Sequence, residues 1–172
     1  ELEILVVENG STDDTLAIGR RLAEALPSVL VSTRPVADYG AALRDGILAA
    51  RGELIITFDV DYYDLRFVDD ALLLLTRAAP APAIVVGSKR APGARDERPW
   101  PRQLVTTVFS VLLRTVFSLS VSDTHGMKVM RRVDVEPILD RCRFRTDLFD
   151  TELVIRTQRA GLPVAELPVT AQ

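Results

Sequence analysis

The sequence predicts an α/β domain built on a mostly parallel β-sheet with helices on both faces. Short runs rich in Val, Ile and Leu alternate along the chain with segments of helical periodicity, which is the pattern of strands joined by crossover helices. The runs are apolar at nearly every position, as strands buried on both faces are. The chain has 172 residues, of which 48% are hydrophobic and 26% are charged, so we expect one globular domain over residues 1–172.

The first two predicted strands cover residues 3–7 and 29–32, where apolar and β-branched residues follow one another. Between them a helix should begin near Ser11 or Thr12, because either hydroxyl can cap a helix N-terminus. Asp13 follows in the first turn, where the helix dipole favours an acid. These segments are expected to form the first strand–helix–strand unit.

The next elements continue the alternation. A helix is expected over residues 38–51, and it ends at a glycine, which is the usual residue just beyond a helix. Strands are expected at residues 54–58 and 84–87. The helix between them, over residues 66–78, places its apolar residues on one face and ends before a proline.

The second half of the chain departs from this alternation. Residues 91–101 are rich in Pro, Gly and charge and are predicted to form a loop. Residues 103–121 are strongly apolar and are predicted to form an amphipathic helix. This helix is expected either to be buried in the domain or in a dimer, or to lie on a membrane surface, and a membrane span is the least favoured alternative. A last helix is expected over residues 149–160, followed by an extended segment at 163–169.

Composition excludes several classes of function. The net charge of -3 does not predict a broad basic surface, so no nucleic-acid partner is expected. Cys142 is the single cysteine and His125 the single histidine, which excludes an intramolecular disulfide, a cysteine-rich zinc site and a two-histidine zinc motif. The chain opens on an apolar strand without the pattern of an export signal, so a cytoplasmic location is expected.

Asp59 and Asp61 follow the predicted strand at residues 54–58. The carboxyl ends of strands in an open α/β sheet form its ligand-binding edge. In an extended segment, residues at i and i+2 point to the same side, so we expect both carboxylates to converge on one divalent cation, Mg2+ or Mn2+. A solvated pair of strand-end acids is the alternative. Such a cation would suit a substrate that carries a diphosphate.

Several segments resemble, in the same order, the motifs of family 2 glycosyltransferases, which adopt the Rossmann-like GT-A fold. The resemblance is nearest to the dolichol- and polyprenyl-phosphate sugar synthases. It includes the Asp-x-Asp motif at Asp59 and Asp61, the family's Gly-Ser-Arg segment, its D-x-x-x-G-F-[RK] segment and its closing acidic segment. The matching segments are residues 6–15, 39–52, 58–61, 87–90, 122–128, 150–153 and 166–169.

The resemblance implies a donor-binding side of the site. It implies that Glu8 contacts the nucleoside, that Asp59 contacts the ribose or the diphosphate, and that Asp61 binds the metal directly and is catalytic. For Glu8 the alternative is a strand-end acid that caps the following loop. The donor-binding residues implied in this way are Glu8, Gly10, Ser11, Asp38, Gly40 and Asp59, and the implied metal ligands are Asp59 and Asp61.

The resemblance also implies an acceptor side. Lys89, Arg90 and Arg102 are expected to position the phosphate of the acceptor, because Arg and Lys side chains bind phosphate oxygens. A solvated basic loop is the alternative for these residues. Asp123 and Glu152 are expected to be catalytic near the acceptor, and Asp150 forms with Glu152 the late acidic pair that supplies the base in relatives with hydroxyl acceptors. For Asp123 the alternative is a capping role, and for Glu152 it is a surface position on the last helix.

The activity implied by the resemblance is metal-dependent transfer of one sugar from a GDP- or UDP-sugar to a polyprenyl (dolichyl) phosphate, with inversion at the anomeric carbon. It implies peripheral contact with the inner face of the cell membrane, and the sequence is compatible with a homo-oligomer. The first alternative is a family 2 glycosyltransferase with a saccharide or other hydroxyl acceptor. The second is a non-catalytic Rossmann-like module that binds a nucleotide or a partner protein.

One strand of the family pattern is missing. In the family, a first strand precedes the segment where this chain begins and lies in the middle of a sheet of order 3-2-1-4. Without it, the strands at residues 3–7 and 54–58 would each keep an unpaired edge. We therefore expect the domain to be incomplete at its N-terminus and to bind the donor poorly.

Overall fold

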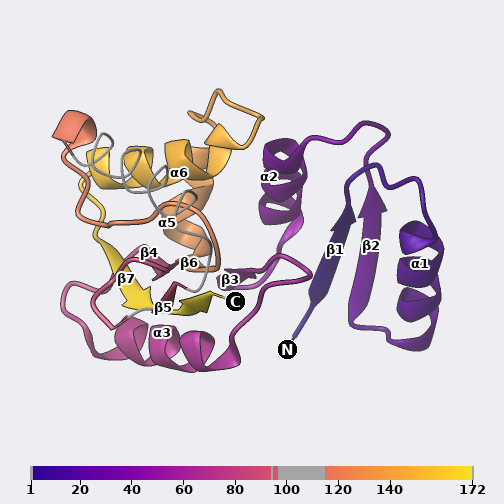
Figure 1. Cartoon of the computed structure of the whole chain (residues 1–172), viewed down its shortest axis with the longest axis horizontal. Coiled ribbons are helices and arrows are strands. Elements are labelled where there is room, and N and C mark those ends of the chain that lie inside the picture. Colours follow the sequence, from indigo (N-terminus) through magenta and orange to yellow (C-terminus); the bar gives the residue numbers. More distant parts are fainter. Residues whose placement is uncertain (1, 94, 97–114, 172) are drawn as a thin grey trace.

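The computed structural model describes residues 2–93, 95–96 and 115–171. Arg102, part of the predicted loop and most of the predicted apolar helix lie outside these ranges. The described part forms two units that lie side by side (Figure 1). We call residues 3–49 the first unit, and residues 54–93, 95–96 and 115–171 the second unit.

The first unit is a two-stranded parallel sheet with a helix against each strand. β1 (Ile4–Glu8) pairs in parallel with β2 (Val29–Thr33). α1 (Thr15–Ala25) packs against β2, and α2 (Tyr39–Ala49) packs against β1 (Figure 1). The predicted strand–helix alternation is therefore confirmed in this part of the chain.

α1 begins later than the sequence predicted. The N–H group of Ser11 donates to the Glu8 carboxylate and so belongs to the loop after β1. The first helical residue is Thr15, whose N–H donates to Asp13 Oδ1 at 3.0 Å. Local hydrogen bonding by Asp13 therefore sets the start of this helix, in place of the hydroxyl caps that were expected.

The second unit is built on a four-stranded sheet of order β3-β6-β4-β7. β6 runs antiparallel to both of its neighbours, whereas β4 and β7 are parallel. The sheet is therefore mixed, because a strand that the sequence analysis did not predict lies between two predicted ones. The strands, with the short parallel ribbon of β5 and β8, are β3 (Leu54–Thr57), β4 (Ile84–Ser88), β5 (Arg95–Asp96), β6 (Lys128–Arg131), β7 (Val164–Pro168) and β8 (Thr170–Ala171).

Helices cover both faces of this sheet, as predicted (Figure 1). α3 (Leu65–Arg77) packs on one face, in a buried cluster that includes Val85 of β4. α5 (Arg132–Leu139) and α6 (Leu148–Arg159) pack on the other face, in a larger cluster that includes Ile84. Successive residues of β4 thus serve two cores, because side chains alternate between the faces of a strand.

The described end of the predicted apolar helix stops before residue 121. Residues 115–117 are helical, and Ser118 has a φ of 53°, a left-handed conformation that ends the helix. Leu119 and Val121 are then buried in the cluster around α5 and α6. Among the described residues, no helix is both long and apolar enough to span a membrane.

β1 and β3 each keep one edge without a strand partner in the described part of the chain. Apolar side chains on both strands remain exposed, since Ile4 is 44% and Leu54 is 40% exposed. The Glu3 carboxylate accepts hydrogen bonds from the N–H groups of Arg51 (2.6 Å) and Gly52 (3.2 Å), in the segment that joins the two units. The missing first strand stays a prediction.

Candidate active site

Glu8 lies at the end of β1, where its side chain organises the loop that follows. Its carboxylate accepts hydrogen bonds from the Thr33 hydroxyl (2.5 Å) and the Ser11 N–H, and only 5% of the residue is exposed. These hydrogen bonds, with that from Thr33 first, lower the pKa of Glu8. The loop-capping alternative is present in the structure, and contact between Glu8 and a nucleoside stays a prediction.

The loop after β1 is held against the loop after β2. Gly10 has a φ of 73°, and a Cβ atom there would lie 2.9 Å from the backbone nitrogen of Ala37, so a side chain would be strained. Asn9 Oδ1 accepts a hydrogen bond from the Asp38 N–H (2.8 Å), and Asp38 in turn caps α2 through the Ala41 N–H (3.1 Å). The predicted donor-binding residues of the first unit thus lie together at the carboxyl ends of β1 and β2.

Gly40 joins the two units by close backbone contact. A Cβ atom on Gly40 would lie 2.0 Å from the Thr146 carbonyl oxygen and 2.6 Å from that of Arg145. No other side chain fits there unless the backbone moves, which accounts for a glycine inside the first turn of α2. The contact brings Tyr39, the residue before it, next to the start of α6.

Asp59 and Asp61 lie in a tight turn. β3 ends at Thr57, and the Tyr62 N–H donates to the Asp59 carbonyl (3.1 Å), which closes the turn. The predicted extended geometry, with both carboxylates on one side of a strand, is therefore wrong, because the pairing of Tyr62 with Asp59 reverses the chain. Asp59 Oδ1 accepts a hydrogen bond from the Tyr39 hydroxyl (3.1 Å), and Asp61 is exposed.

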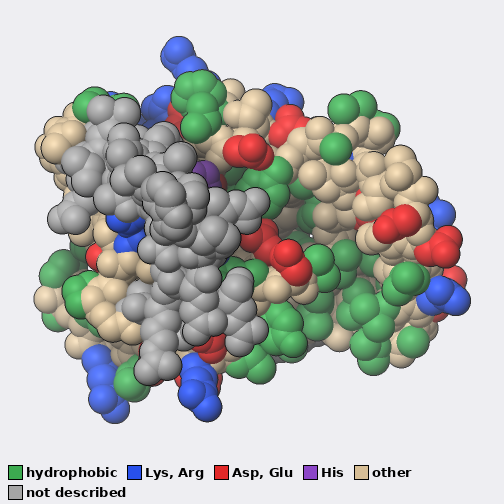
Figure 2. Space-filling model, in the orientation of Figure 1, with side chains coloured by type: hydrophobic (Ala, Val, Ile, Leu, Met, Phe, Trp, Pro, Cys, Tyr) green, Lys and Arg blue, Asp and Glu red, His purple; other side chains and the backbone are tan. Residues whose placement is uncertain are grey.

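A divalent cation at this turn stays a prediction. No cluster of three or more His, Cys, Asp or Glu residues that could hold a metal ion occurs in the described ranges. Mg2+ is usually bound by one or two carboxylates together with substrate phosphates. Asp59 and Asp61 supply carboxylates of that number. Figure 2 shows that the surface is hollowed between the two units and that acidic side chains gather beside the hollow.

Lys89 lies beside the same turn. Its ammonium nitrogen is 4.1 Å from the centre of the Tyr62 ring, which is a cation–π contact. The Ser88 hydroxyl accepts a hydrogen bond from the Arg90 N–H (3.1 Å) and so shapes the loop after β4. Of the predicted phosphate-binding residues, Lys89 and Arg90 follow β4, Lys89 lies next to the turn, and Arg102 lies outside the described residues.

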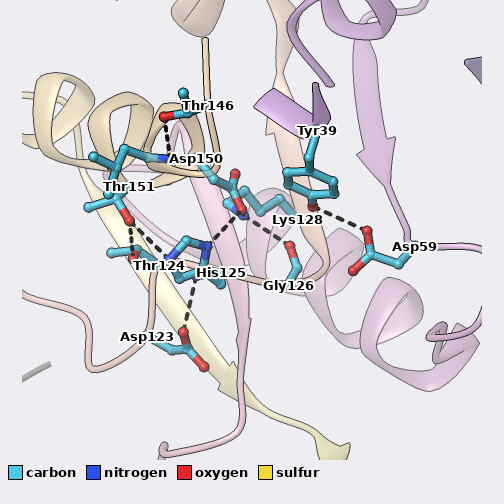
Figure 3. A network of polar contacts seen from close by, with 11 residues as sticks. Tyr39, Asp59, Asp123, Thr124, His125, Gly126, Lys128, Thr146, Asp150 and Thr151 are labelled. Carbon is cyan, nitrogen blue, oxygen red and sulfur yellow. Dashed lines mark hydrogen bonds and ion pairs between the residues drawn. The ribbon is translucent and has the colours of Figure 1, made fainter. Parts of the chain in front are cut away.

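Asp123 caps a turn in the loop before β6. It is 7% exposed, and its Oδ1 accepts a hydrogen bond from the His125 N–H (3.0 Å). His125 Nε2 lies 3.3 Å from the Thr151 hydroxyl, which is 2.8 Å from the Thr124 hydroxyl (Figure 3). These contacts hold the loop against α6. The capping alternative is therefore present, and a catalytic role for Asp123 stays a prediction.

Two buried charges lie in the same network: Asp150, which belongs to the predicted late acidic pair, and Lys128, to which the sequence analysis gave no role. Lys128 and Asp150 are each 1% exposed, and Lys128 Nζ donates to Asp150 Oδ2 at 2.7 Å (Figure 3). Burial raises the pKa of Asp150, and the Lys128 charge opposes this shift. Asp150 Oδ1 has no hydrogen-bond partner within the described ranges. The signal in the sequence was a lysine between Met127 and Val129, since a charge in an apolar run must be paired when it is buried.

Glu152 is held by donors on three sides. Glu152 Oε2 accepts hydrogen bonds from the N–H groups of Arg143 (2.7 Å) and Phe144 (2.8 Å), and Oε1 accepts one from Arg156 Nε (2.7 Å). Burial raises the pKa of Glu152, but these hydrogen bonds outweigh burial and lower it overall. Glu152 thus fixes the loop before α6. Its predicted role as a catalytic base stays a prediction, which would require these donors to be displaced.

The chain is similar to known proteins over nearly its whole length. Residues 1–139 match the model of glycosyl transferase family 2. An uncharacterized glycosyltransferase from Mycobacterium bovis is 35% identical over 167 residues, which cover 96% of this chain and 72% of the relative. A dolichyl-phosphate beta-glucosyltransferase from Trichomonas vaginalis is 28% identical over 177 residues, which cover 97% of this chain and 53% of the relative.

A solved structure shows the same fold. Glucosyl-3-phosphoglycerate synthase from Mycobacterium tuberculosis, in complex with uridine diphosphate, matches with a TM-score of 0.66 and 21% identity over 96% of this chain and 57% of that structure. This likeness confirms the predicted GT-A fold class, over little more than half of the neighbour's length. The family model and the mycobacterial relative together show that this chain belongs to glycosyl transferase family 2.

Proposed function

We propose that this glycosyltransferase moves one sugar from a nucleotide-sugar to a polyprenyl phosphate, with a divalent cation and with inversion at the anomeric carbon. The observation that carries the proposal is the turn of Asp59 and Asp61 after β3, with Tyr39 bound to Asp59 and Lys89 beside the turn. Carboxylates and a lysine at this edge of a sheet suit a metal-bound diphosphate. The dolichyl-phosphate glucosyltransferase among the relatives supports a lipid phosphate as acceptor.

Asp59 and Asp61 are the residues that we assign to Mg2+ or Mn2+. When it is bound, the cation offsets the negative charge that develops on the leaving diphosphate. Tyr39 engages one oxygen of Asp59 and leaves the other for the cation. Lys89 adds a positive charge on the same side of the turn.

We place the nucleoside of the donor against the loops after β1 and β2, at Glu8, Gly10, Ser11 and Asp38. The hydrogen bonds of Glu8 and Asp38 give these loops a defined shape before any ligand binds. The uridine diphosphate in the mycobacterial structure supports a nucleoside diphosphate on this fold. Both UDP- and GDP-sugars remain candidate donors.

The state of Glu152 favours a phosphate acceptor. A hydroxyl acceptor needs a base to remove its proton, whereas a phosphate monoester is already anionic and nucleophilic. Both oxygens of Glu152 are engaged by donors, and its pKa is lowered, which makes it a weak base. Lys89 and Arg90, with Arg102, are the cations that we assign to the acceptor phosphate. A lipid acceptor would place the protein in peripheral contact with the inner face of the cell membrane.

A hydroxyl acceptor is the second candidate, and Asp150 is the observation that favours it. One Asp150 oxygen has no partner in the described part of the chain, and burial raises its pKa, as suits a base. Membership in a glycosyltransferase family supports an enzyme over the non-catalytic module.

Transfer assays with Mn2+ or Mg2+ test the proposal, with UDP- and GDP-sugars as donors and either polyprenyl phosphates or sugar alcohols as acceptors. We expect product with the lipid phosphate, and a loss of kcat/KM of about a hundredfold or more for Asp61→Ala, because one group that stabilises the leaving charge is removed. Asp69→Ala, at an exposed position of α3, is the matched control and should remain active. Product with sugar alcohols alone would favour the second candidate, and full activity of Asp61→Ala would contradict the metal assignment.

A further inference from the structure

The pair of Asp150 and Lys128 lies deep between the donor half and the acceptor half of the site. Asp150 comes from α6 and Lys128 from β6, and both are 1% exposed. Lys128 Nζ also donates to the Gly126 carbonyl at 2.9 Å. Burying two charges carries a large desolvation cost, and an apolar pair of the same size is often as stable or more stable. Stability alone therefore does not account for this pair.

Tyr39 lies on the donor side of the pair (Figure 3). The close packing of Gly40 against Thr146 holds the start of α2 beside α6, one helical turn before Asp150. The Tyr39 hydroxyl donates a hydrogen bond to Asp59 Oδ1 at 3.1 Å.

His125 lies on the acceptor side of the pair (Figure 3). Its Nδ1 is 3.9 Å from Asp150 Oδ2, and its Nε2 is 3.3 Å from the Thr151 hydroxyl. Its backbone N–H is bound by Asp123. The side chain of His125 is 46% exposed, so it reaches from the buried carboxylate of Asp150 to the surface of the site.

We propose that the Asp150–Lys128 pair is a positioning element that sets the two halves of the active site relative to each other. The pair fixes α6, against whose start Gly40 and Tyr39 are held, and so positions the Tyr39–Asp59 hydrogen bond on the donor side, while Asp150 orients His125 on the acceptor side. The inference rests on the proposed function, because it takes Asp59 as a ligand of the cation. The second oxygen of Asp150, which has no partner within the described ranges, remains for a group that enters between the halves.

The test replaces the pair by apolar side chains, in Asp150→Leu combined with Lys128→Met. We expect a melting temperature close to that of the wild type, since such replacements are tolerated. Binding of Mn2+ with UDP or GDP is monitored by paramagnetic broadening of the Asp59 and Asp61 amide signals. The affinity should fall about tenfold, which is the effect of losing one hydrogen bond to a charged group, here that of Tyr39 to Asp59. KM for the donor should rise by a similar factor.

Two further variants separate positioning from a general loss of structure. Tyr39→Phe removes only the hydroxyl and should weaken nucleotide binding by the same factor. Adding it to the double variant should cause no further loss, because groups that act through one another are not additive. Arg131→Met with Asp134→Leu replaces a partly buried ion pair at the other end of β6 and should leave nucleotide binding unchanged.

Each outcome decides between the alternatives. Unchanged nucleotide binding in the folded double variant would overturn the inference. If that variant does not fold, Asp150→Asn with and without Tyr39→Phe replaces it, and additive losses would overturn the inference. A wild-type protein that binds Mn2+ and nucleotide but glycosylates no polyprenyl phosphate overturns the proposed function alone. The absence of Mn2+-dependent nucleotide binding at millimolar concentration overturns both.

Discussion

The two units of the molecule differ in how they are held together. All of the largest fully buried side chains lie in the second unit, around β4 and β6, whereas α1 of the first unit has no buried residue. Two large apolar side chains of α1, Ile18 and Leu22, are about half exposed, and so is Leu26 directly after the helix. A region with few buried apolar contacts opens locally at low free energy. We infer that the second unit carries most of the folding free energy.

The same comparison explains where the candidate site lies. The second unit supplies the turn of Asp59 and Asp61 and the buried Asp150–Lys128 pair, whereas the first unit supplies Tyr39 and the loops assigned to the nucleoside. The well-packed second unit thus carries the residues assigned to the cation, and the weakly packed first unit carries part of the nucleotide-binding surface. Three predictions test this division, in order of decreasing effect.

The largest effect is expected for matched leucines in the two units. Leu153 of α6 is 0% exposed, and Leu22 of α1 is 44% exposed. Leu153→Ala should lower the free energy of unfolding by about 2–5 kcal/mol, because it leaves a cavity. Leu22→Ala should lower it by less than about 1 kcal/mol. Urea unfolding of both variants measures the difference, and similar losses would show that the two units are equally well packed.

Two glycines in the same backbone conformation give the second test. Gly10 of the first unit has a φ of 73° and Gly161 of the second a φ of 78°. Alanine should cost about 1–2 kcal/mol at either position from the left-handed conformation alone. Gly10→Ala should cost more, because its Cβ would lie 2.9 Å from the Ala37 nitrogen, whereas nothing lies within 4 Å of a Cβ at Gly161.

Hydrogen exchange shows which part of the molecule is destabilised by Gly10→Ala. If the first unit opens locally, Gly10→Ala should speed exchange of the β1 and β2 amides and leave the β4 amides protected. Gly161→Ala should lower the protection of all the core amides together. Uniform loss of protection in Gly10→Ala would show that the two units unfold as one.

The elements of the fold were predictable where neighbouring residues in the sequence determine them. Uniform apolar runs gave β1 and β3, and the Asp38 cap fixed the start of α2 within one residue of the prediction. β6 was missed because Lys128 interrupts its apolar pattern, and only the carboxylate of Asp150, on a distant helix, makes that position suitable for a buried strand. Long-range pairing of this kind leaves little trace in periodicity.

The candidate site was predictable in its residues and less so in its geometry. The Asp-x-Asp motif and the strand end were apparent, but the turn depends on the pairing of Tyr62 with Asp59, which no spacing rule gives. Glu8 and Glu152 were predicted because they match acids in the motifs of the family, and the structure shows both carboxylates engaged by nearby N–H and hydroxyl groups. The number of donors around a carboxylate depends on loop conformation, which the sequence pattern does not specify.

The smallest effect is expected on the pH dependence of stability, and this test again compares the two units. The pKa of Glu152 is lowered in the folded state, so its stabilising contribution is complete above the ordinary glutamate pKa of about 4.3 and is lost as pH falls through the lower, folded value. Glu152→Gln should therefore flatten the fall in global stability between about pH 5 and pH 3, measured by urea unfolding.

The pKa of Glu8 is also lowered in the folded state, so Glu8→Gln should change acid sensitivity in the same direction. Because Glu8 lies in the weakly packed unit, we expect its effect in the exchange of β1 and β2 amides, with little change in the global unfolding midpoint. A larger change in the midpoint for Glu8→Gln than for Glu152→Gln would contradict the division of stability between the units.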